Sequence, residues 1–529
     1  MRLQALDHPL PMLLLLFGCA PTVACSSEQP QATHPPEEPA KTERKAEQPV
    51  PPWAGDARWY QIAVPAFENG DLDSVRKHLP YLKELGVNTL YLTHVFAGCT
   101  DERCEKVDQR HIDDALGVRD SRAAPSSETN DPGSWKFSGS DGVFLGLVKE
   151  AHAQEFRIVV DAPFAEALSS RGASEGTEAL LLQTTRRWLD PDGDGNPADG
   201  IDGWVVRGPE KLSRDFWVRW REHAKKVNPS ALLVCDVSGD STTWLAGDTF
   251  DVAVNYAAAE AIRRFLAPGG VPYSVEQFLG DLTAISTRYN PAKSLGAVIP
   301  LSWGERGRLF AAMKDGASNL QDGDAEAARN PTTDAYARWR LAVVLHFFYL
   351  GAPMAYCGDE GENSANIVPA SGRSDPQGAS ADERCKIADY RGDFASLIKW
   401  LNIRRQIDAP IRLGDFRAVM SDEARHVFAF ARSLPGNEAV LVVNYGDTKQ
   451  RVILQVGKPG ELVGVLSPAL DPLALPKGLE KFSAPQAAGK IRPLRMGGSR
   501  QYVDTGGHVR LSVDPMSVRV VLIKDDPTG

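Results

Sequence analysis

The sequence predicts a (β/α)8 TIM barrel followed by a small C-terminal antiparallel β-sandwich domain. Two observations predict this fold. Short apolar runs, rich in Val, Ile and Leu on both faces, alternate with amphipathic helical patterns over about 350 residues, as expected of parallel strands covered by helices. Beyond about residue 411 the pattern changes to period-two runs separated by turn residues, which predicts antiparallel strands. We therefore expect a barrel over 54–410 and a β domain over 411–529.

Helical patterns separate the predicted barrel strands. In the first of them Val75, Leu79 and Leu82 fall on one face, and Gly86 ends the helix. The gap between the second and third strands, at about 97–140, is polar and contains Gly, Pro and Ser, so we expect a loop excursion there. The predicted barrel strands lie at 59–67, 88–95, 157–164, 203–207, 232–238, 250–256, 296–302 and 351–359, and those of the β domain at 426–434, 439–445, 450–456, 509–513 and 518–523.

The N-terminal segment has the features of an export signal followed by a tether. An apolar run over 10–17 is too short to span a bilayer but typical of a signal-peptide core, so 1–25 are expected to be a signal peptide. Its end resembles a bacterial lipobox with Cys19 as the lipidated residue; a plain secretory signal cleaved near Ala24 is the alternative. Residues 26–53 are rich in Pro and Glu, which predicts a disordered linker. We expect an exported protein of the bacterial cell envelope, anchored by lipid alone on the periplasmic or surface side.

Net charge and cysteine content limit the kinds of molecule and compartment that fit this protein. The formal net charge is −10 and the isoelectric point is near 5.6, which argues against nucleic acid because phosphates attract basic surfaces. The seven cysteines fit export into an oxidising compartment. Cys99 with Cys104 is one candidate disulfide and Cys357 with Cys385 is a second, although the pairing stays open at this point. Cys235 lies in an apolar run, which predicts a buried thiol.

Several stretches resemble the α-amylase family of glycoside hydrolases, in its neopullulanase- and cyclomaltodextrinase-like branch. WYQI at 59–62 and YLKELGVNTLYLTHVF at 81–96 resemble the first two barrel strands of that family. RRWLDPDGDGNPADGIDGW at 186–204 is similar to the run into its fourth strand, and WLAGDTFDVAVNY at 244–256 and YLGAPMAYCGDE at 349–360 are similar to its sixth and eighth strands. The resemblance implies hydrolysis or transfer at α-glucosidic bonds by a retaining mechanism, which needs two carboxyl groups about 5 Å apart.

The positions that the resemblance assigns to catalysis depart from the family pattern. In the family the nucleophile ends the fourth strand, the acid ends the fifth, and a third carboxylate follows the seventh. Here these positions hold Arg207, Asp236 and Glu305. A guanidinium stays protonated and offers no lone pair, so Arg207 cannot form the glycosyl ester. Asp236 is one methylene shorter than the family's Glu, and Val205 stands where the family has a supporting Arg. We do not expect these residues to form a competent catalytic set.

Other side chains are candidate ligand contacts. Asp161 is kept at the end of the third strand and Glu166 follows it, while Trp204 and Trp303 could stack on sugar rings or belong to the core. Further along, oxygen ligands at alternating positions around a glycine turn resemble the first half of a calcium loop. The alternative is a polar turn whose side chains cap backbone amides. The candidate calcium ligands are Asp190, Asp192, Asp194, Asn196 and Asp199.

These observations favour an exported α-amylase-family homologue linked to α-glucan metabolism that lacks glycosidase activity. It would act as a glucan-binding or interaction protein, with an α-glucan, a maltooligosaccharide or an envelope protein as partner, and with calcium as the one cofactor considered. Family precedent exists for an interaction role, because the heavy subunits of heteromeric amino-acid transporters resemble amylases without acting as one. Two alternatives remain: an active α-glucan hydrolase or glucanotransferase with a rearranged acidic site, and a surface scaffold with no sugar ligand.

Overall fold

The barrel strands follow one another in the order that the sequence predicts. In the computed structural model the described residues are 49–97, 108–119, 128–162, 164, 175–267, 272–304, 307–314, 335–361, 385–387, 393–455, 462–467 and 497–524. The predicted signal peptide with Cys19, the linker up to residue 48, and the Cys99–Cys104 pair therefore lie outside the described residues.

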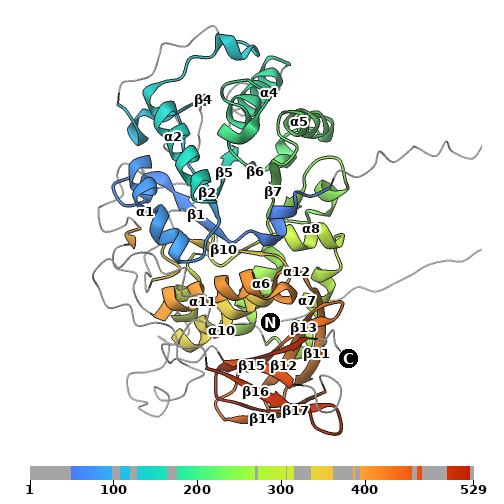
Figure 1. Cartoon of the computed structure of the whole chain (residues 1–529). Helices are drawn as coiled ribbons and strands as arrows, with labels where there is room; N and C mark the ends of the chain where they lie inside the picture. Colours follow the sequence, from blue (N-terminus) through green and yellow to red (C-terminus); the bar gives the residue numbers. More distant parts are fainter. Residues whose placement is uncertain are drawn as a thin grey trace, which may run out of the picture. The chain divides into compact units, whose positions relative to one another are not determined.

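Eight parallel strands form one sheet in the order β8-β7-β6-β5-β2-β1-β10-β9. Figure 1 shows the part of this sheet that runs from β7 through β6, β5, β2 and β1 to β10. The sheet closes into a barrel where Val254 bridges Val298, next to a hydrogen bond from the Asn255 backbone N–H to the Val298 carbonyl at 2.7 Å. Each of the eight predicted runs contains one strand, so the predicted barrel is confirmed. The strands are β1 (Trp59–Ala63), β2 (Thr89–Thr93), β5 (Arg157–Ala162), β6 (Gly203–Arg207), β7 (Leu232–Asp236), β8 (Val252–Ala253), β9 (Val298–Pro300) and β10 (Ala352–Tyr356).

Branched side chains fill the inside of the barrel. Val159, Val205, Val234 and Val298 from four different strands belong to one buried cluster with Trp59. Residues two apart along a strand share a face, so the next inward positions toward the carboxyl ends are those that line the mouth of the barrel. The inside of the barrel is therefore a packed core. The positions available for function lie in the next layer of side chains, at the carboxyl ends of the strands.

The amino end of the barrel is covered by the short helix η1 (Pro52–Asp56). Ala54 is fully buried in the barrel's inner cluster, and Val50 and Trp53 pack against it. The predicted linker over 26–53 therefore extends too far, because its last residues belong to the folded unit. The reason is that Val50 and Trp53 supply the apolar contacts that the rest of the linker lacks.

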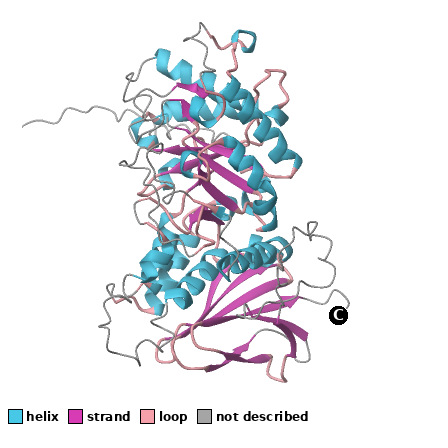
Figure 2. Cartoon of the chain, turned by 90° about the vertical axis from the view of Figure 1, so that its left-hand side faces the viewer, coloured by secondary structure: helices cyan, strands magenta, loops and turns pink. Residues whose placement is uncertain are grey.

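Helices surround the barrel strands (Figure 2). The first, α1, buries Val75, Leu79 and Leu82 and ends before Gly86, whose φ is 84°, as predicted. No helix in the described part of the chain combines the length and apolarity that a membrane crossing requires. The helices are α1 (Leu72–Glu84), α2 (Gly139–Ala153), α4 (Glu175–Leu189), α5 (Arg214–Val227), α6 (Tyr256–Leu266), α7 (Val275–Ser286), α8 (Pro291–Gly296), α9 (Leu309–Lys314), α10 (Ala335–Phe348), α11 (Asp393–Ile407) and α12 (Ala409–Leu413).

The excursion between the second and third barrel strands contains a short antiparallel pair, β3 (Phe96–Ala97) and β4 (Asp108–Ile112). A buried ion cluster ties its described part to the barrel helices. His111 contacts Asp141 of α2 at 2.8 Å, and Arg187 of α4 contacts Glu128 at 3.0 Å. These four side chains hold the polar excursion in place where few apolar residues are available to do so.

The C-terminal region consists of antiparallel sheets, as predicted. A six-stranded sheet has the order β11-β12-β13-β18-β15-β16, and β14 pairs with β17. All five predicted strands are present, whereas β11, β15 and β16 were not predicted. The strands are β11 (Asp415–Asp422), β12 (Val427–Leu434), β13 (Asn437–Asn444), β14 (Gln450–Gln455), β15 (Leu462–Ser467), β16 (Gly497–Tyr502), β17 (His508–Val513) and β18 (Ser517–Lys524).

The central strands of this sheet are buried on both faces. Along β12, Val427, Ala429 and Ala431 face a cluster shared with β14 and β17, whereas Phe428 and Phe430 join the cluster of the barrel helices. The side chain of Arg432 is fully buried and donates to the carbonyls of Phe348 and Tyr349 at the end of α10. Sheet and helices therefore share one core, within the compact unit that runs from Glu47 to the end of the chain.

Candidate functional site

Six consecutive barrel strands each place one polar or aromatic residue at their carboxyl ends. Asp161, Arg207 and Asp236 stand two positions beyond Val159, Val205 and Val234 of the inner core, so they form the next inward layer. Of the other three, His94 directly follows β2, whereas Tyr256 and Trp303 lie three residues beyond the ends of β8 and β9. In strand order the six residues are His94, Asp161, Arg207, Asp236, Tyr256 and Trp303.

Asp161 and Arg207 form an ion pair between the third and fourth strands. The Arg207 Nη2 lies 2.7 Å from the Asp161 Oδ2, and the Asp161 side chain is only 1% exposed. The other oxygen of Asp161, Oδ1, accepts a hydrogen bond from the backbone N–H of His94 at 3.3 Å. Both oxygens of this carboxylate are thus engaged by the protein itself.

His94 holds an unusual backbone conformation beside this pair. Its φ of 59° lies in the left-handed region, which costs free energy for a residue with a side chain. Burial lowers the pKa of its imidazole, with the Asp161 charge acting in the opposite direction. His94 is therefore neutral at neutral pH, and its contribution to the site is the backbone N–H that it turns toward Asp161.

Asp236 and Tyr256 form a second pair, across the fifth and sixth strands. The Tyr256 hydroxyl donates to the Asp236 Oδ1 at 2.9 Å. Burial and the nearby Asp236 charge raise the pKa of Tyr256 well above its ordinary value. Tyr256 therefore stays protonated and acts as a fixed donor. Asp236 also lies beside Arg207, its partner in the register of β6 and β7.

Trp303 continues the row on the seventh strand. It follows β9 and forms an isolated antiparallel bridge with Gly307. Its ring centroid lies 5.5 Å from that of Tyr256, and the guanidinium of Arg263 lies 5.6 Å from the centroid of the Trp303 ring. Trp303 is partly exposed.

Trp204, which was predicted to contact a ligand, lies elsewhere. It is fully buried in the layer between barrel and helices, with its ring centroid 6.1 Å from Phe96 and 5.7 Å from Phe164. Its neighbours in the sequence, Val205 and Arg207, share the inner face of β6, so alternation turns Trp204 outward. The structure therefore does not support a sugar-stacking role for Trp204. The other predicted residues, Glu166 and Glu305, lie outside the described residues.

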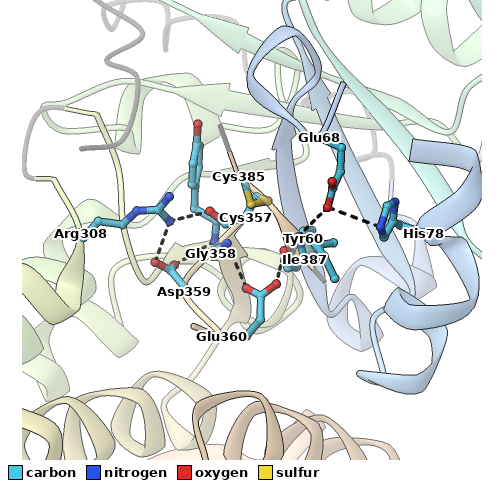
Figure 3. The surroundings of a disulfide bond; sticks show 11 residues. Tyr60, Glu68, His78, Arg308, Cys357, Gly358, Asp359, Glu360, Cys385 and Ile387 are labelled. Carbon is cyan, nitrogen blue, oxygen red and sulfur yellow. Dashed lines mark hydrogen bonds and ion pairs between the residues drawn. A yellow bond between two sulfur atoms is a disulfide. The ribbon is translucent and has the colours of Figure 1, made fainter. Parts of the chain in front are cut away.

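The first, seventh and eighth strands carry a buried acidic cluster that the sequence reasoning did not single out (Figure 3). The Ser302 hydroxyl donates to Asp359 at 2.6 Å. Arg308 donates to the Cys357 carbonyl at 2.6 Å and lies 3.4 Å from Asp359. The Tyr60 hydroxyl donates to Glu360, which is fully buried. Burial raises the pKa of Glu360 to about 7. The available signal was the pair of carboxylates, Asp359 and Glu360, at the end of the eighth predicted strand.

A disulfide lies against this cluster. Cys357 and Cys385 are bonded (Figure 3), which confirms the second candidate pair. Cys385 forms an isolated parallel bridge with Phe67, and the Glu68 carboxylate accepts from the Ile387 N–H at 2.6 Å. The disulfide thus joins the end of the eighth strand to a segment held beside the first strand. Cys235 is a buried free thiol, as predicted, and burial raises its pKa.

The candidate calcium loop brings three of its five predicted ligands together. Carboxylate oxygens of Asp190, Asp192 and Asp199 lie within 4.8 Å of one another. Asp194 and Asn196 instead accept from backbone N–H groups two residues further on, at 2.7 and 3.3 Å, as in the polar-turn alternative. Burial, together with the charge of Asp192, raises the pKa of Asp199. The loop precedes β6 and lies at the amino end of the barrel, so a cation there would stabilise the fold and take no part in chemistry at the mouth.

Comparisons with known proteins agree with this geometry. No protein-family model matches the chain. The chain is 26% identical to neopullulanase 2 of Thermoactinomyces vulgaris over 438 residues, which cover 77% of the chain and 68% of that protein. It is 24% identical to a cyclomaltodextrinase of Thermoanaerobacter pseudethanolicus, with 76% of the chain and 72% of that protein covered.

These relatives support a place for the chain in the α-amylase family of glycoside hydrolases. Its relatives place it in the neopullulanase- and cyclomaltodextrinase-like branch, and so among the proteins of α-glucan metabolism. The α-amylase-family fold is also seen in a solved structure, the cyclic α-maltosyl-(1→6)-maltose hydrolase of Arthrobacter globiformis in complex with cyclic α-maltosyl-(1→6)-maltose. That structure matches with a TM-score of 0.61 and 19% identity, covering 90% of this chain and all of the other.

Proposed function

We propose that this α-amylase-family protein binds an α-glucan or maltooligosaccharide at the mouth of its barrel without hydrolysing it. The observation that carries the proposal is the Arg207–Asp161 ion pair. Arg207 ends the fourth strand, where the family pattern has its nucleophile, and its guanidinium has no lone pair with which to attack a glycosidic carbon. The pair, formed by a buried Asp161 and a partly exposed Arg207, fills that position with opposite charges in contact.

The remaining carboxylates do not supply a replacement pair. Among the described residues that end the third, fourth and fifth strands, the carboxylates are Asp161 and Asp236. Asp161 is almost completely buried and both its oxygens accept hydrogen bonds from the protein. A retaining mechanism needs one carboxylate as nucleophile and a second group as acid and base. Asp236 can serve one of these roles, and Asp161 is committed to Arg207.

A glucan ligand is supported by the relatives and by one feature of the mouth. The chain's relatives are named for action on pullulan and cyclomaltodextrin, and the matching solved structure holds a cyclic maltosyl-maltose. The mouth of this barrel keeps aromatic side chains, Tyr256 and Trp303, next to the carboxylate of Asp236. Aromatic surface beside hydrogen-bonding groups is typical of a site for a neutral sugar.

Two assays on the soluble part of the protein, from about residue 49, test the proposal. Isothermal titration calorimetry with maltoheptaose and with β-cyclodextrin should give measurable binding. Incubation with starch, pullulan, cyclodextrins and maltooligosaccharides should release no reducing sugar above a buffer blank. Turnover that disappears in Asp236→Ala would overturn the proposal and show an active, rearranged site. Absence of binding to every glucan would also overturn it, and would favour an interaction protein or a surface scaffold.

We further propose that the protein is exported and anchored to the bacterial cell envelope through lipid on Cys19. The apolar run before Cys19 and the Pro- and Glu-rich segment after it support this location. The Cys357–Cys385 disulfide is also of a kind that persists outside the cytoplasm. Mass spectrometry of the mature N-terminus should find a lipid-modified Cys19, and Cys19→Ala should release the protein from membranes. An unmodified start near Ser26 would contradict the anchor.

A further inference from the structure

Trp303 differs from most other tryptophans of the described chain in being partly open to solvent at the barrel mouth. The fully buried ones line the core and are Trp59, Trp188, Trp204, Trp217, Trp220 and Trp339. Trp303 instead packs on the edge of the core, three residues beyond the end of the seventh strand. Ligands of such barrels bind at the carboxyl ends of the strands. The partly exposed indole of Trp303 lies in that region.

The ring of Trp303 is held in a fixed orientation by the protein. The Arg263 guanidinium lies 5.6 Å from the Trp303 ring centroid, close enough for a cation–π contact. Arg263 is itself 9% exposed and donates to the carbonyls of Gly307 and Arg308, at 3.3 and 3.4 Å. Because Trp303 also bridges Gly307, its backbone and the cationic partner of its ring both contact Gly307. Because the ring is already held in place, its side chain would lose little conformational entropy when a ligand stacks on it.

Tyr256 links this aromatic surface to a carboxylate. Its ring lies 5.5 Å from Trp303 with an interplanar angle of 47°, and its hydroxyl donates to Asp236. The three side chains come from the ends of the fifth, sixth and seventh strands and form one continuous wall. A pyranose ring has an apolar C–H face and an edge of hydroxyl donors, so it matches an indole face next to a carboxylate acceptor.

We propose that Trp303, Tyr256 and Asp236 form a binding wall for a neutral pyranose ring, in which the sugar stacks on Trp303 and donates its hydroxyls toward Asp236. This inference rests on the proposed glucan-binding function and names the side chains that recognise the ligand. The wall does not use the Arg207–Asp161 pair, which fills the neighbouring third and fourth strand ends. The wall thus includes the family's acid position, Asp236, but not its nucleophile position, which Arg207 occupies.

Trp53 offers a matched control. It is also a partly exposed tryptophan with a guanidinium near its ring, that of Arg157 at 5.7 Å. However, Trp53 lies at the opposite, amino end of the barrel, where its indole N–H donates to the Ser230 carbonyl at 3.0 Å. Removing either ring costs a similar packing contact, but only Trp303 belongs to the proposed wall.

The experiment is titration of wild type, Trp303→Ala, Trp303→Phe and Trp53→Ala with maltoheptaose, followed by calorimetry and by tryptophan fluorescence. We expect Trp303→Ala to weaken binding at least about tenfold, the loss that one well-packed aromatic contact produces. Trp303→Phe should recover part of this loss, and Trp53→Ala should bind like the wild type. The wild-type fluorescence change on binding should persist in Trp53→Ala and shrink in Trp303→Phe.

The outcomes separate this inference from the proposed function. If the wild type binds maltoheptaose and Trp303→Ala binds equally well, the wall is wrong while glucan binding stands. If the wild type binds no glucan, the proposed glucan-binding function is itself wrong. Circular dichroism checks that each variant is folded. If Trp303→Ala does not fold, Trp303→Phe and Asp236→Asn are titrated in its place. Unchanged affinity for maltoheptaose in both would show that the proposed wall is wrong.

Discussion

Removal of the Cys357–Cys385 disulfide should destabilise the protein by an amount that follows from the length of the loop it closes (Figure 3). The bond closes a loop between residues 28 positions apart in the sequence. In the chain-entropy model, a loop of this length restricts the unfolded state by about 3–4 kcal/mol at 25 °C. Replacing both cysteines by Ser should therefore lower the free energy of unfolding by that amount. For a folded unit of this size, the unfolding entropy converts the loss to a fall in Tm of only about 3–4 °C.

The assay is thermal unfolding of wild type, Cys357→Ser, Cys385→Ser and the double variant by differential scanning calorimetry. Each single variant already abolishes the bond, so both should match the double variant within about 0.5 kcal/mol. Wild type unfolded with an excess of a dithiol reductant should approach the same Tm. Effects of the single variants that add up in the double variant would refute the reasoning. They would mean that the stability comes from the separate packing of two buried side chains.

Three further predictions concern charged groups. Arg207→Ala should lower the free energy of unfolding, measured by urea denaturation, by roughly 2–4 kcal/mol, because it leaves the buried Asp161 without its counter-ion. The double variant Arg207→Ala/Asp161→Ala should recover part of this loss. No recovery would contradict the ion pair. Burial acts to lower the pKa of His152, but the hydrogen bond and charge of Asp202 at 2.8 Å outweigh it and raise the pKa. The stability from this raised pKa is fully present below the ordinary value near 6.5 and is lost as pH rises through the folded value. His152→Gln should therefore remove a fall in stability that the wild type shows as pH rises above about 6.5; parallel profiles would contradict this. If the loop at Asp190 holds calcium, a chelator should lower the Tm of the wild type and leave that of Asp190→Asn unchanged, whereas equal Tm values with and without millimolar calcium would favour the plain polar turn.

Local periodicity in the sequence accounts for most of the fold. All eight barrel strands and five of the C-terminal strands lie where apolar runs predict them. Two of the three missed strands carry no such signal, whereas β15 (LVGVLS) is itself a short apolar run. The side chains of β11 are mostly exposed or intermediate in burial, and β16 reads GGSRQY, which has neither branched residues nor alternation. These strands form because a neighbouring strand offers its hydrogen-bonding edge.

The candidate site was predictable in part. The resemblance to the family placed Arg207 and Asp236 at strand ends, and the structure puts them side by side in the register of β6 and β7. Trp204 and Trp303 looked alike in the sequence, yet one faces the helices and the other the barrel mouth. Alternation along 203–207 could have separated them, because Arg207 and Trp204 must lie on opposite faces.

The sequence by itself determined the barrel, the β domain and the arginine at the end of the fourth strand. These depend on hydrophobic periodicity and on local motifs, which neighbouring residues encode. Only the tertiary structure decided which groups meet: Asp161 with Arg207, Tyr256 with Asp236, and Tyr60 with Glu360, which is 300 residues away in the chain. Such pairs form because closure of the barrel brings distant strand ends into one ring, and burial there makes each charged or polar group require a partner.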